Sequence, residues 1–345
     1  MDQKALTFSS SGLAGFALAS LRDAVETFRH LAVVMVPVLV GVKLLQEAGL
    51  VEPLAAPLAP VTSLVGLPAS MGLVWATAML NNIYTAMVVF VTIAAVEPVT
   101  QAQVTVLATM ILVAHNLPVE LGIAKRAGTG IIFQLLVRVG GAVGLGFLLH
   151  HLYQGLGLLQ DPARLLWKPA QQSGDPSLAA WAGGQVVSLG AIFAIILVLV
   201  TVMRILEKLR VTERVVGLLK PVLHWLGLGR TAAPLTIVGL IMGIAYGGGL
   251  IIKESRSGTV RPRDCFMAMT LLGMTHSVVE DTLLMVALGA HLSGILWARV
   301  LFSLLAVFLL SRMLTVLPGR LAGMLLYKNR PIPADPQSAS PTKHP

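Results

Sequence analysis

Charged side chains are scarce in this sequence. Asp, Glu, Lys and Arg make up 12% of its 345 residues, while 56% are hydrophobic. Soluble proteins carry roughly 25% charged residues, so an ordinary water-soluble fold is excluded. A single cysteine, Cys265, excludes an internal disulfide framework and a cysteine-rich metal cluster. The sequence also lacks a G-x-x-x-x-G-K-[ST] phosphate loop and a convincingly placed catalytic nucleophile, so we expect no enzyme.

Long apolar runs are what the sequence has in abundance. A membrane-spanning helix needs about 20 apolar residues, and stretches of that order recur along the chain. They lie at 30–48, 69–96, 101–123, 130–152, 186–205, 231–252, 264–290 and 295–318. Residues 10–29 mix apolar and charged side chains, which is typical of a helix lying in the membrane interface. We therefore predict an all-α polytopic membrane protein.

Two of the apolar stretches are interrupted. Asn81-Asn82 breaks the stretch 69–96, and Gly247-Gly248-Gly249 lies near the end of 231–252. Polar or glycine breaks at membrane depth are tolerated in re-entrant hairpins that line protein or water. We therefore interpret both stretches as hairpins.

The distribution of Lys and Arg supports the hairpins. With the amino terminus inside, two hairpins place the basic stretches 204–230 and 253–263 on the same side, whereas eight plain spans would separate the basic clusters. We expect both termini in the cytoplasm, in a bacterial inner membrane. The net charge of +9 is then a topology signal, and no nucleic acid is expected as a partner.

The sequence aligns with itself at an offset of 161 residues, Leu45–Leu149 against Leu206–Leu310. The residues that coincide are scarce or conformationally special: Glu52 with Glu213, Pro60 with Pro221, Gly66 with Gly227, Thr109 with Thr270, His115 with His276, Gly128 with Gly289 and Arg138 with Arg299. Each repeat would hold about three transmembrane helices, a re-entrant hairpin and an amphipathic segment (53–66 or 214–227). An odd number of crossings inverts the second copy, as in many secondary transporters.

These features divide the chain into five parts. They are an interfacial amino-terminal segment (1–29), a first repeat (30–152), a linker (153–185), a second repeat (186–318) and a disordered cytoplasmic tail rich in Pro and Ser (319–345).

The strongest chemical signal is a His-and-acid motif in each repeat, at residues 114–120 and 275–281. The candidate binding residues in it are His115, Asn116, Glu120, His276, Glu280 and Asp281. Ionisable groups inside a membrane span indicate a functional site. The structural alternative is that these side chains tie helices together.

Two arginines and the hairpin tips complete the candidates. We expect Arg138 and Arg299 to pair with Glu120 and Asp281, because a buried guanidinium needs a carboxylate. The alternatives are that these arginines snorkel or bind an anionic group of the substrate. The tips offer amides, hydroxyls and freed backbone groups for a polar solute: Asn81, Asn82, Tyr84 and Thr85 in the first, and Tyr246, Gly247, Gly248 and Gly249 in the second. Close helix packing is the alternative reading of the glycines.

Fourteen methionines, including Met267, Met269, Met274 and Met285 near His276, raise the question of a transition metal. We interpret the methionines as membrane core, since Met fills irregular gaps. If a metal ion binds, its ligands would be His115, Glu120, His276 and Asp281.

The duplicated His-and-acid helices, the Gly66-Leu67-Pro68 entry to an interrupted hairpin and the repeat length resemble the gate domain, also called the nucleoside recognition domain. That domain occurs in concentrative nucleoside transporters, in the membrane part of ferrous-iron permease B proteins and in spore maturation membrane proteins. The resemblance covers roughly residues 30–150 and 186–318. It implies an inverted-repeat membrane fold whose hairpins meet at a central site.

These observations lead us to expect a secondary transporter that moves a small polar solute, nucleoside-like solutes included, by alternating access. The alternatives are a divalent metal ion permease and a non-transporting assembly factor of the spore-maturation type. The expected partners are the lipid bilayer and a small polar solute or ion. No cofactor is expected, and a coupling ion and a homo-oligomer are left open.

Overall fold

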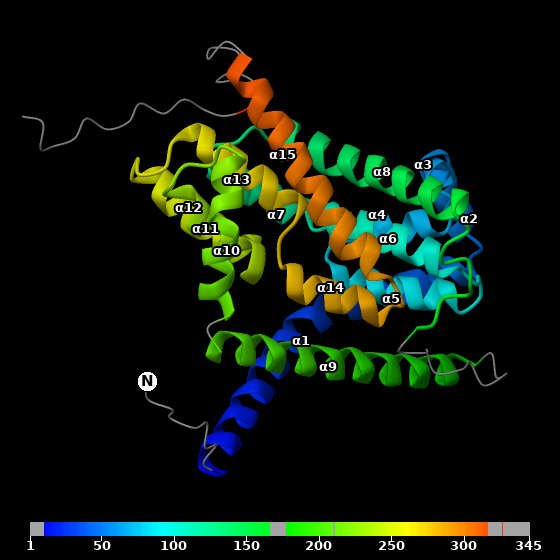
Figure 1. The fold of residues 1–345 in the computed structure, drawn as a ribbon. Coiled ribbons are helices and arrows are strands. Elements are labelled where there is room, and N and C mark those ends of the chain that lie inside the picture. The colour runs from blue at the N-terminus through cyan, green and yellow to red at the C-terminus, as the bar shows by residue number, and fades with distance from the viewer. Residues whose placement is uncertain (1–9, 166–176, 210, 317–325, 327–345) are drawn as a thin grey trace, which may run out of the picture.

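The computed structural model describes residues 10–165, 177–209, 211–316 and 326. Throughout this part the chain forms helices and no strand longer than an isolated bridge (Figure 1). The helices are α1 (Ser10–Glu47), α2 (Val51–Ala55), η1 (Ala56–Leu58), α3 (Ala59–Leu64), α4 (Met71–Leu80), α5 (Ile83–Ala94), α6 (Gln101–Val113), α7 (Leu117–Arg126), α8 (Ile131–Gly155), α9 (Leu178–Lys208), α10 (Val211–Trp225), α11 (Ala232–Met242), α12 (Ile244–Arg256), α13 (Pro262–Met274), α14 (Val278–Ala287), η2 (Ser293–Ala298) and α15 (Arg299–Val316).

Five helical segments of the described chain are long and apolar enough to cross a membrane: Ala14–Glu47, Gln101–Arg126, Ile131–Gly155, Leu178–Lys208 and Ser293–Val316. Each exceeds the roughly 20 residues that a bilayer core requires. The predicted all-α, multi-pass membrane fold is therefore confirmed. The remaining predicted crossing, 264–290, is built from the shorter helices α13 and α14 with a break between them, just as Gln101–Arg126 is built from α6 and α7.

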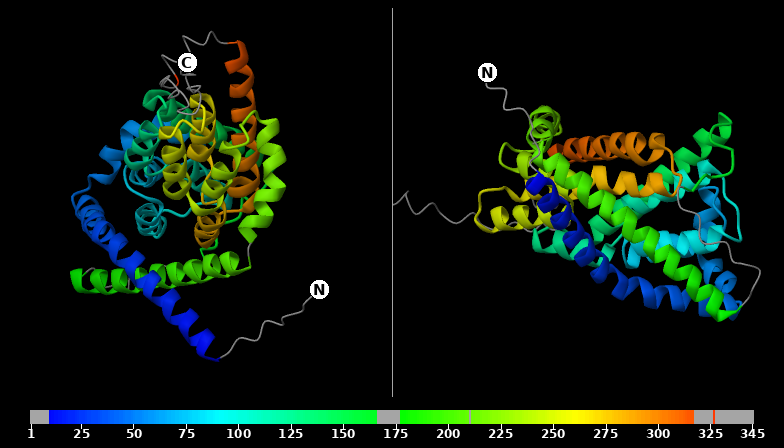
Figure 2. Two further views of the ribbon diagram at one scale, coloured as in Figure 1. Left: turned by 90° about the vertical axis from the view of Figure 1, so that its left-hand side faces the viewer. Right: turned by 90° about the horizontal axis from the view of Figure 1, so that it is seen from below.

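Helices α1 and α9 contact each other and cross beside the rest of the bundle, as Figure 2 shows. α1 is continuous from Ser10 to Glu47, so the predicted division at residue 29 is not a helix boundary. Helix α9 starts at Leu178, which lies inside the predicted linker 153–185. The predicted disordered tail, 319–345, lies outside the described residues except for Leu326.

The first interrupted stretch folds as two short antiparallel helices, α4 and α5, packed against each other. At about 1.5 Å per residue, helices of 10 and 12 residues reach only part of the way across a bilayer core. The break lies at Asn81-Asn82, as predicted. The Asn82 side chain accepts a hydrogen bond from the Thr85 amide at 2.9 Å and caps α5.

The second interrupted stretch also forms a helix pair, but the predicted tip at Gly247–Gly249 is wrong. The break falls at Gly243, whose φ of +98° favours glycine, and the three later glycines lie inside α12. Gly247 is there for close packing: a Cβ on it would lie 2.3 Å from the Cα of Gly239 in α11. Gly243 is the residue that matches Asn82 at the repeat offset.

Helix boundaries repeat at the same offset of 161 residues. α6 and α13 match at both ends, as do α7 and α14, and α4–α5 matches α11–α12 to within a residue. In Figure 1 the two short-helix pairs lie at opposite ends of the molecule, with α4–α5 on the right and α11–α12 on the left. The tandem repeat seen in the sequence therefore has a counterpart in the helices.

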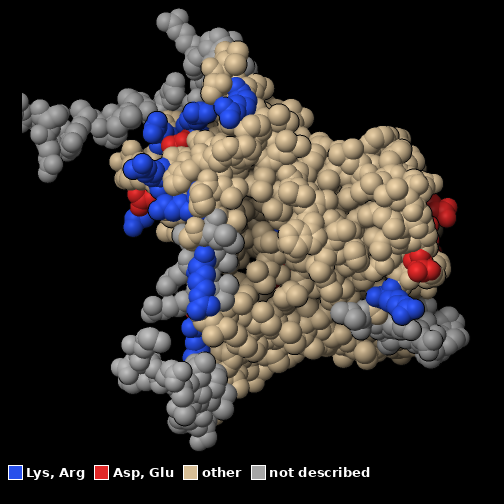
Figure 3. Space-filling view, in the orientation of Figure 1, with Lys and Arg blue, Asp and Glu red and all other residues tan. Residues whose placement is uncertain are grey.

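Lys and Arg gather at the end of the molecule formed by α10 to α13, as the space-filling view in Figure 3 shows. The opposite end of this face carries mainly Asp and Glu, and the surface between is almost uncharged. An uncharged belt between two polar ends is the surface expected of a protein that crosses a bilayer.

Candidate functional site

The site is built where two helices break. α6 ends at Val113 and α7 starts at Leu117, while α13 ends at Met274 and α14 starts at Val278. Asn116 and Ser277 take left-handed conformations at the breaks, with φ of +48° and +43°. Non-glycine residues adopt this conformation only at a cost of roughly 1–2 kcal/mol. Both breaks have the same local geometry and free backbone carbonyls from the helical hydrogen-bond pattern.

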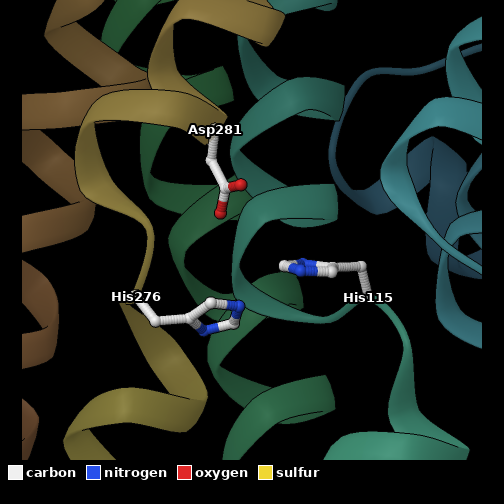
Figure 4. Close-up of side chains that lie close together, drawn as sticks. All are labelled: His115, His276 and Asp281. Atoms are coloured by element: carbon white, nitrogen blue, oxygen red, sulfur yellow. The ribbon is translucent and has the colours of Figure 1, made fainter. Parts of the chain in front are cut away.

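Glu120 of α7 lies between the two histidines. Its Oε1 is 3.3 Å from His115 Nε2 and 3.5 Å from His276 Nε2, and the rings of His115 and His276 have centroids 5.1 Å apart. Asp281 of α14 points toward the same space, as Figure 4 shows. The ligand atoms of His115, His276 and Asp281 all lie within 4.8 Å of one another. Residues 161 positions apart thus form one buried polar cluster, hereafter the central cluster (His115, Glu120, His276, Asp281).

Arg138 of α8 joins this cluster to the first break. Its Nη1 is 2.6 Å from Glu120 Oε2, its Nη2 donates to the His115 carbonyl at 2.8 Å, and its Nε donates to the Val113 carbonyl at 3.1 Å. The side chain is 1% exposed. The structure thus brings the first predicted charge pair together. The guanidinium also donates hydrogen bonds to the backbone carbonyls that are freed where α6 ends.

Arg299 repeats only half of this pattern. Its Nη2 donates to the His276 carbonyl at 2.8 Å and its Nε to Thr275 Oγ1 at 3.1 Å. The predicted direct pair with Asp281 is not formed: the described residues show no ion pair between them, and Asp281 Oδ2 and Arg299 Nη1 have no hydrogen-bond partner there. Aspartate is one methylene shorter than glutamate, and the π-helical turn η2 immediately precedes Arg299. Asp281 is therefore left facing the histidines.

Next to the central cluster lies an acid-lined cavity of about 510 Å³ between α1, α9 and the core. Its polar lining comprises Asp23, Glu26, Thr27, Tyr84, Arg204, Glu207 and Glu280. Arg204 is bound to Asp23, so three carboxylates remain without that partner. Tyr84 donates a hydrogen bond to Glu280 Oε1 at 2.9 Å, which joins α5 to α14. Because Glu280 precedes Asp281 in sequence, the first turn of α14 separates the cavity from the central cluster.

The other predicted tip residues are scattered. Asn81 is partly exposed at the first break, and Thr85 is buried with its hydroxyl 3.1 Å from Asn82 Oδ1. Tyr246 is 61% exposed on the outer side of α12, because Gly247 and Gly248 occupy the inner side. Tyr246 and the glycine run are thus not brought to the central cluster.

Sequence reasoning missed several polar residues. Asp23 and Glu26 lie in the segment 10–29 expected at the membrane interface and Glu207 lies in the basic stretch 204–230, yet all three line the cavity. Gln134 of α8 donates to Thr270 of α13 at 2.9 Å, and both are buried. An isolated Gln in an apolar span was a usable signal for Gln134. The acids gave no signal, because their meeting depends on how α1 crosses α9.

Comparisons with known proteins agree with this architecture. Residues 189–290, from α9 to just beyond α14, match the family model Gate, described as nucleoside recognition. The chain is 27% identical over 287 residues to the uncharacterized membrane protein YvoD of Bacillus subtilis. The aligned region covers 82% of this chain and 90% of YvoD. No solved structure matches the chain. The resemblance to the gate domain is confirmed over residues 189–290, and the chain is a multi-pass membrane protein.

Proposed function

We propose that this protein is a secondary transporter that moves a small polar solute across a bacterial inner membrane. The observation that carries the proposal is the acid-lined cavity, which ends at Glu280, one residue from the central cluster. Substrate sites of transporters are formed where broken helices meet near the membrane midplane. In this chain two broken helices meet at the central cluster, and the cavity supplies a polar approach to it.

The orientation of the two halves supports alternating access. Helix pairs α4–α5 and α11–α12 lie at opposite ends of the molecule, and the helix boundaries repeat at 161 residues. Such an arrangement fits two inverted repeats that rock about a shared site. The Lys- and Arg-rich end in Figure 3 would face the cytoplasm, together with both termini. The cavity would then open toward that side, because Arg204 and Glu207 lie near the end of α9.

Carboxylates in the cavity indicate the charge of the solute. With Glu26, Glu207 and Glu280 lacking the guanidinium partner that Asp23 has, the cavity favours neutral or cationic solutes over anions. Arg138 is not offered to an anionic substrate, because Glu120 and two backbone carbonyls engage its guanidinium.

The test is uptake into liposomes that contain the purified full chain. Uridine serves as a neutral polar probe and ethanolamine as a small cationic probe. We expect time-dependent accumulation of at least one probe and a reduction of tenfold or more in Glu280→Gln. Glu47→Gln is the matched control, because Glu47 is exposed at the far end of α1 and lies outside the cavity. Folded protein that takes up neither probe contradicts the proposal for solutes of these kinds.

A second candidate function is a non-transporting role in membrane assembly. The ion pair between Glu120 and Arg138 favours it, because this pair is buried and locks α7 to α8 at the centre. If the central cluster is purely structural, it does not open to solutes. The wild-type protein should then show no uptake, and loss of Arg138 should abolish folding. Uptake that depends on Glu280 would exclude this second candidate.

A further inference from the structure

We propose that the central cluster binds a transition-metal dication such as Zn²⁺, with His115, His276 and Asp281 as ligands and Glu120 as the fourth. The proposal rests on the proposed transport function only where it takes the ion to be cargo. Binding itself is argued from the geometry of the four side chains.

Both histidines are held in the form that a metal needs. Nδ1 of His115 lies 2.9 Å from the Ile111 carbonyl, and Nδ1 of His276 lies 2.7 Å from the Leu272 carbonyl. A carbonyl oxygen only accepts hydrogen bonds, so each Nδ1 carries the hydrogen. The Nε2 lone pairs of the neutral rings are then free and point into the cluster. Metal-binding histidines are oriented by the same contact to a backbone carbonyl.

In the neutral rings the two Nε2 lone pairs converge on one carboxylate. Both Nε2 atoms face Glu120 Oε1, at 3.3 and 3.5 Å, so three acceptors meet. Asp281 adds a buried carboxylate, 6% exposed, whose Oδ2 has no hydrogen-bond partner among the described residues. Buried acceptors of this kind require a donor or a cation. A metal ion between His115, His276 and Asp281 would give both Nε2 atoms and the Asp281 carboxylate a partner.

The distances suit a tetrahedral ion. With bonds of about 2.0–2.1 Å, two ligand atoms of tetrahedral Zn²⁺ lie about 3.4 Å apart. The two Nε2–Oε1 distances already have this length. The His115, His276 and Asp281 ligand atoms, which lie within 4.8 Å, must close by up to about 1.4 Å relative to the same tetrahedral edge. Side-chain rotation of Asp281 provides such a movement, because this carboxylate is not tied to Arg299.

The charges predict reversible binding. The buried centre already holds as many guanidinium groups, Arg138 and Arg299, as carboxylates, Glu120 and Asp281, so a dication adds net positive charge to it. The site should therefore hold the ion less tightly than a closed structural zinc site does. Weak retention is what a site that releases its cargo requires.

The experiment uses the purified full chain, stripped with a chelator and carrying no histidine tag. Co²⁺ titration should produce the visible absorption bands of tetrahedral Co²⁺ at one equivalent, and Zn²⁺ should displace them. Asp281→Asn, which keeps the shape of the side chain, and His276→Ala should each weaken binding at least tenfold. His151→Ala is the matched control, since His151 is exposed and its Nδ1 also bonds a carbonyl at i−4.

Wild-type protein that gives no Co²⁺ spectrum and binds no Zn²⁺ in equilibrium dialysis overturns the site, whatever the variants do. Unchanged binding in folded His276→Ala and Asp281→Asn overturns the ligand assignment. Uptake of ⁶⁵Zn²⁺ into liposomes is measured separately. Binding without uptake of Zn²⁺ or of the organic probes leaves the metal site intact and contradicts the transport function.

Discussion

Arg138 and Glu120 meet at ion-pair distance, 2.6 Å between Nη1 and Oε2. Among the described residues, Arg299 makes no such pair with Asp281 at the matching position. The guanidinium of Arg138 also binds the two carbonyls that α6 leaves unpaired. One side chain therefore neutralises a buried carboxylate and completes a broken helix. Arg299 does only the second at the matching position, so the two halves of the site are not equivalent.

Removal of one partner of the first pair should be strongly destabilising. Arg138→Gln leaves Glu120 buried without its guanidinium, and breaking a buried pair costs about 3–5 kcal/mol. We expect Glu120→Gln to cost less and the double variant to lose less than the sum of the two. Part of the defect should persist in the double variant, because the carbonyls of Val113 and His115 still lack their donor. Thermal unfolding in detergent measures each effect.

The control for this cycle is the exposed pair Lys43–Glu47, 3.2 Å apart on α1. Lys43→Gln should change stability by no more than about 1 kcal/mol, as for other surface pairs. Additive losses from Arg138→Gln and Glu120→Gln would show that the two side chains act independently, contrary to the geometry.

Glycines of α12 should differ sharply in their tolerance of alanine. At Gly247 a Cβ would lie 2.3 Å from the Cα of Gly239, so Gly247→Ala must push α11 and α12 apart, at about 1–3 kcal/mol. A Cβ added at Gly249 would meet no side chain or neighbouring helix within 4 Å, so Gly249→Ala should be neutral or stabilising by up to about 1 kcal/mol. Unfolding temperatures of the two variants provide the comparison. Equal effects would mean that the two helices are not closely packed at Gly247.

Asn116 should accept glycine and reject alanine. Its φ of +48° costs a residue with a Cβ about 1–2 kcal/mol, and Asn tolerates this conformation better than Ala does. The backbone N–H of Asn116 donates to the Ala78 carbonyl at 2.8 Å, and both variants keep this hydrogen bond because it does not involve the side chain. We expect Asn116→Ala to lower the unfolding temperature and Asn116→Gly to leave it nearly unchanged. The reverse order would indicate that the Asn side chain, not the backbone, determines the break.

Cysteine labelling should distinguish the side of α9 that lines the acid-lined cavity from the side that faces lipid. Met203 lines the cavity, whereas Val198 is 62% exposed and does not. In a Cys265→Ala background, Met203→Cys should react with a water-soluble maleimide and Val198→Cys should not, because the thiolate forms only in contact with water. Mass spectrometry of isolated membranes reads the labelling. A reactive Val198→Cys together with an inert Met203→Cys would mean that the cavity is closed to water.

Much of the site could be predicted because its chemistry is costly in a membrane. His115, Glu120, Arg138 and their counterparts stand out from apolar surroundings, and only a compensating partner allows them to be buried. The first hairpin break was equally visible, since Asn82 is both polar and a good helix cap. The second break lies four residues before the position expected from the sequence. Glycine serves a turn at Gly243 and a close helix contact at Gly247, and the sequence does not distinguish these two roles.

The membrane class, the helical fold, the spacing of 161 residues between the two His-and-acid motifs and the family resemblance can all be read from the amino-acid sequence alone. Hydrophobic length, charge scarcity and residue identity carry these properties along the chain without reference to distant contacts. Three features required the folded chain: Glu120 contacts both histidines, Asp281 forms no ion pair with Arg299, and α1 and α9 line an acidic cavity. Such contacts depend on a methylene of side-chain length and on helix crossing angles, which a linear pattern of residues does not specify.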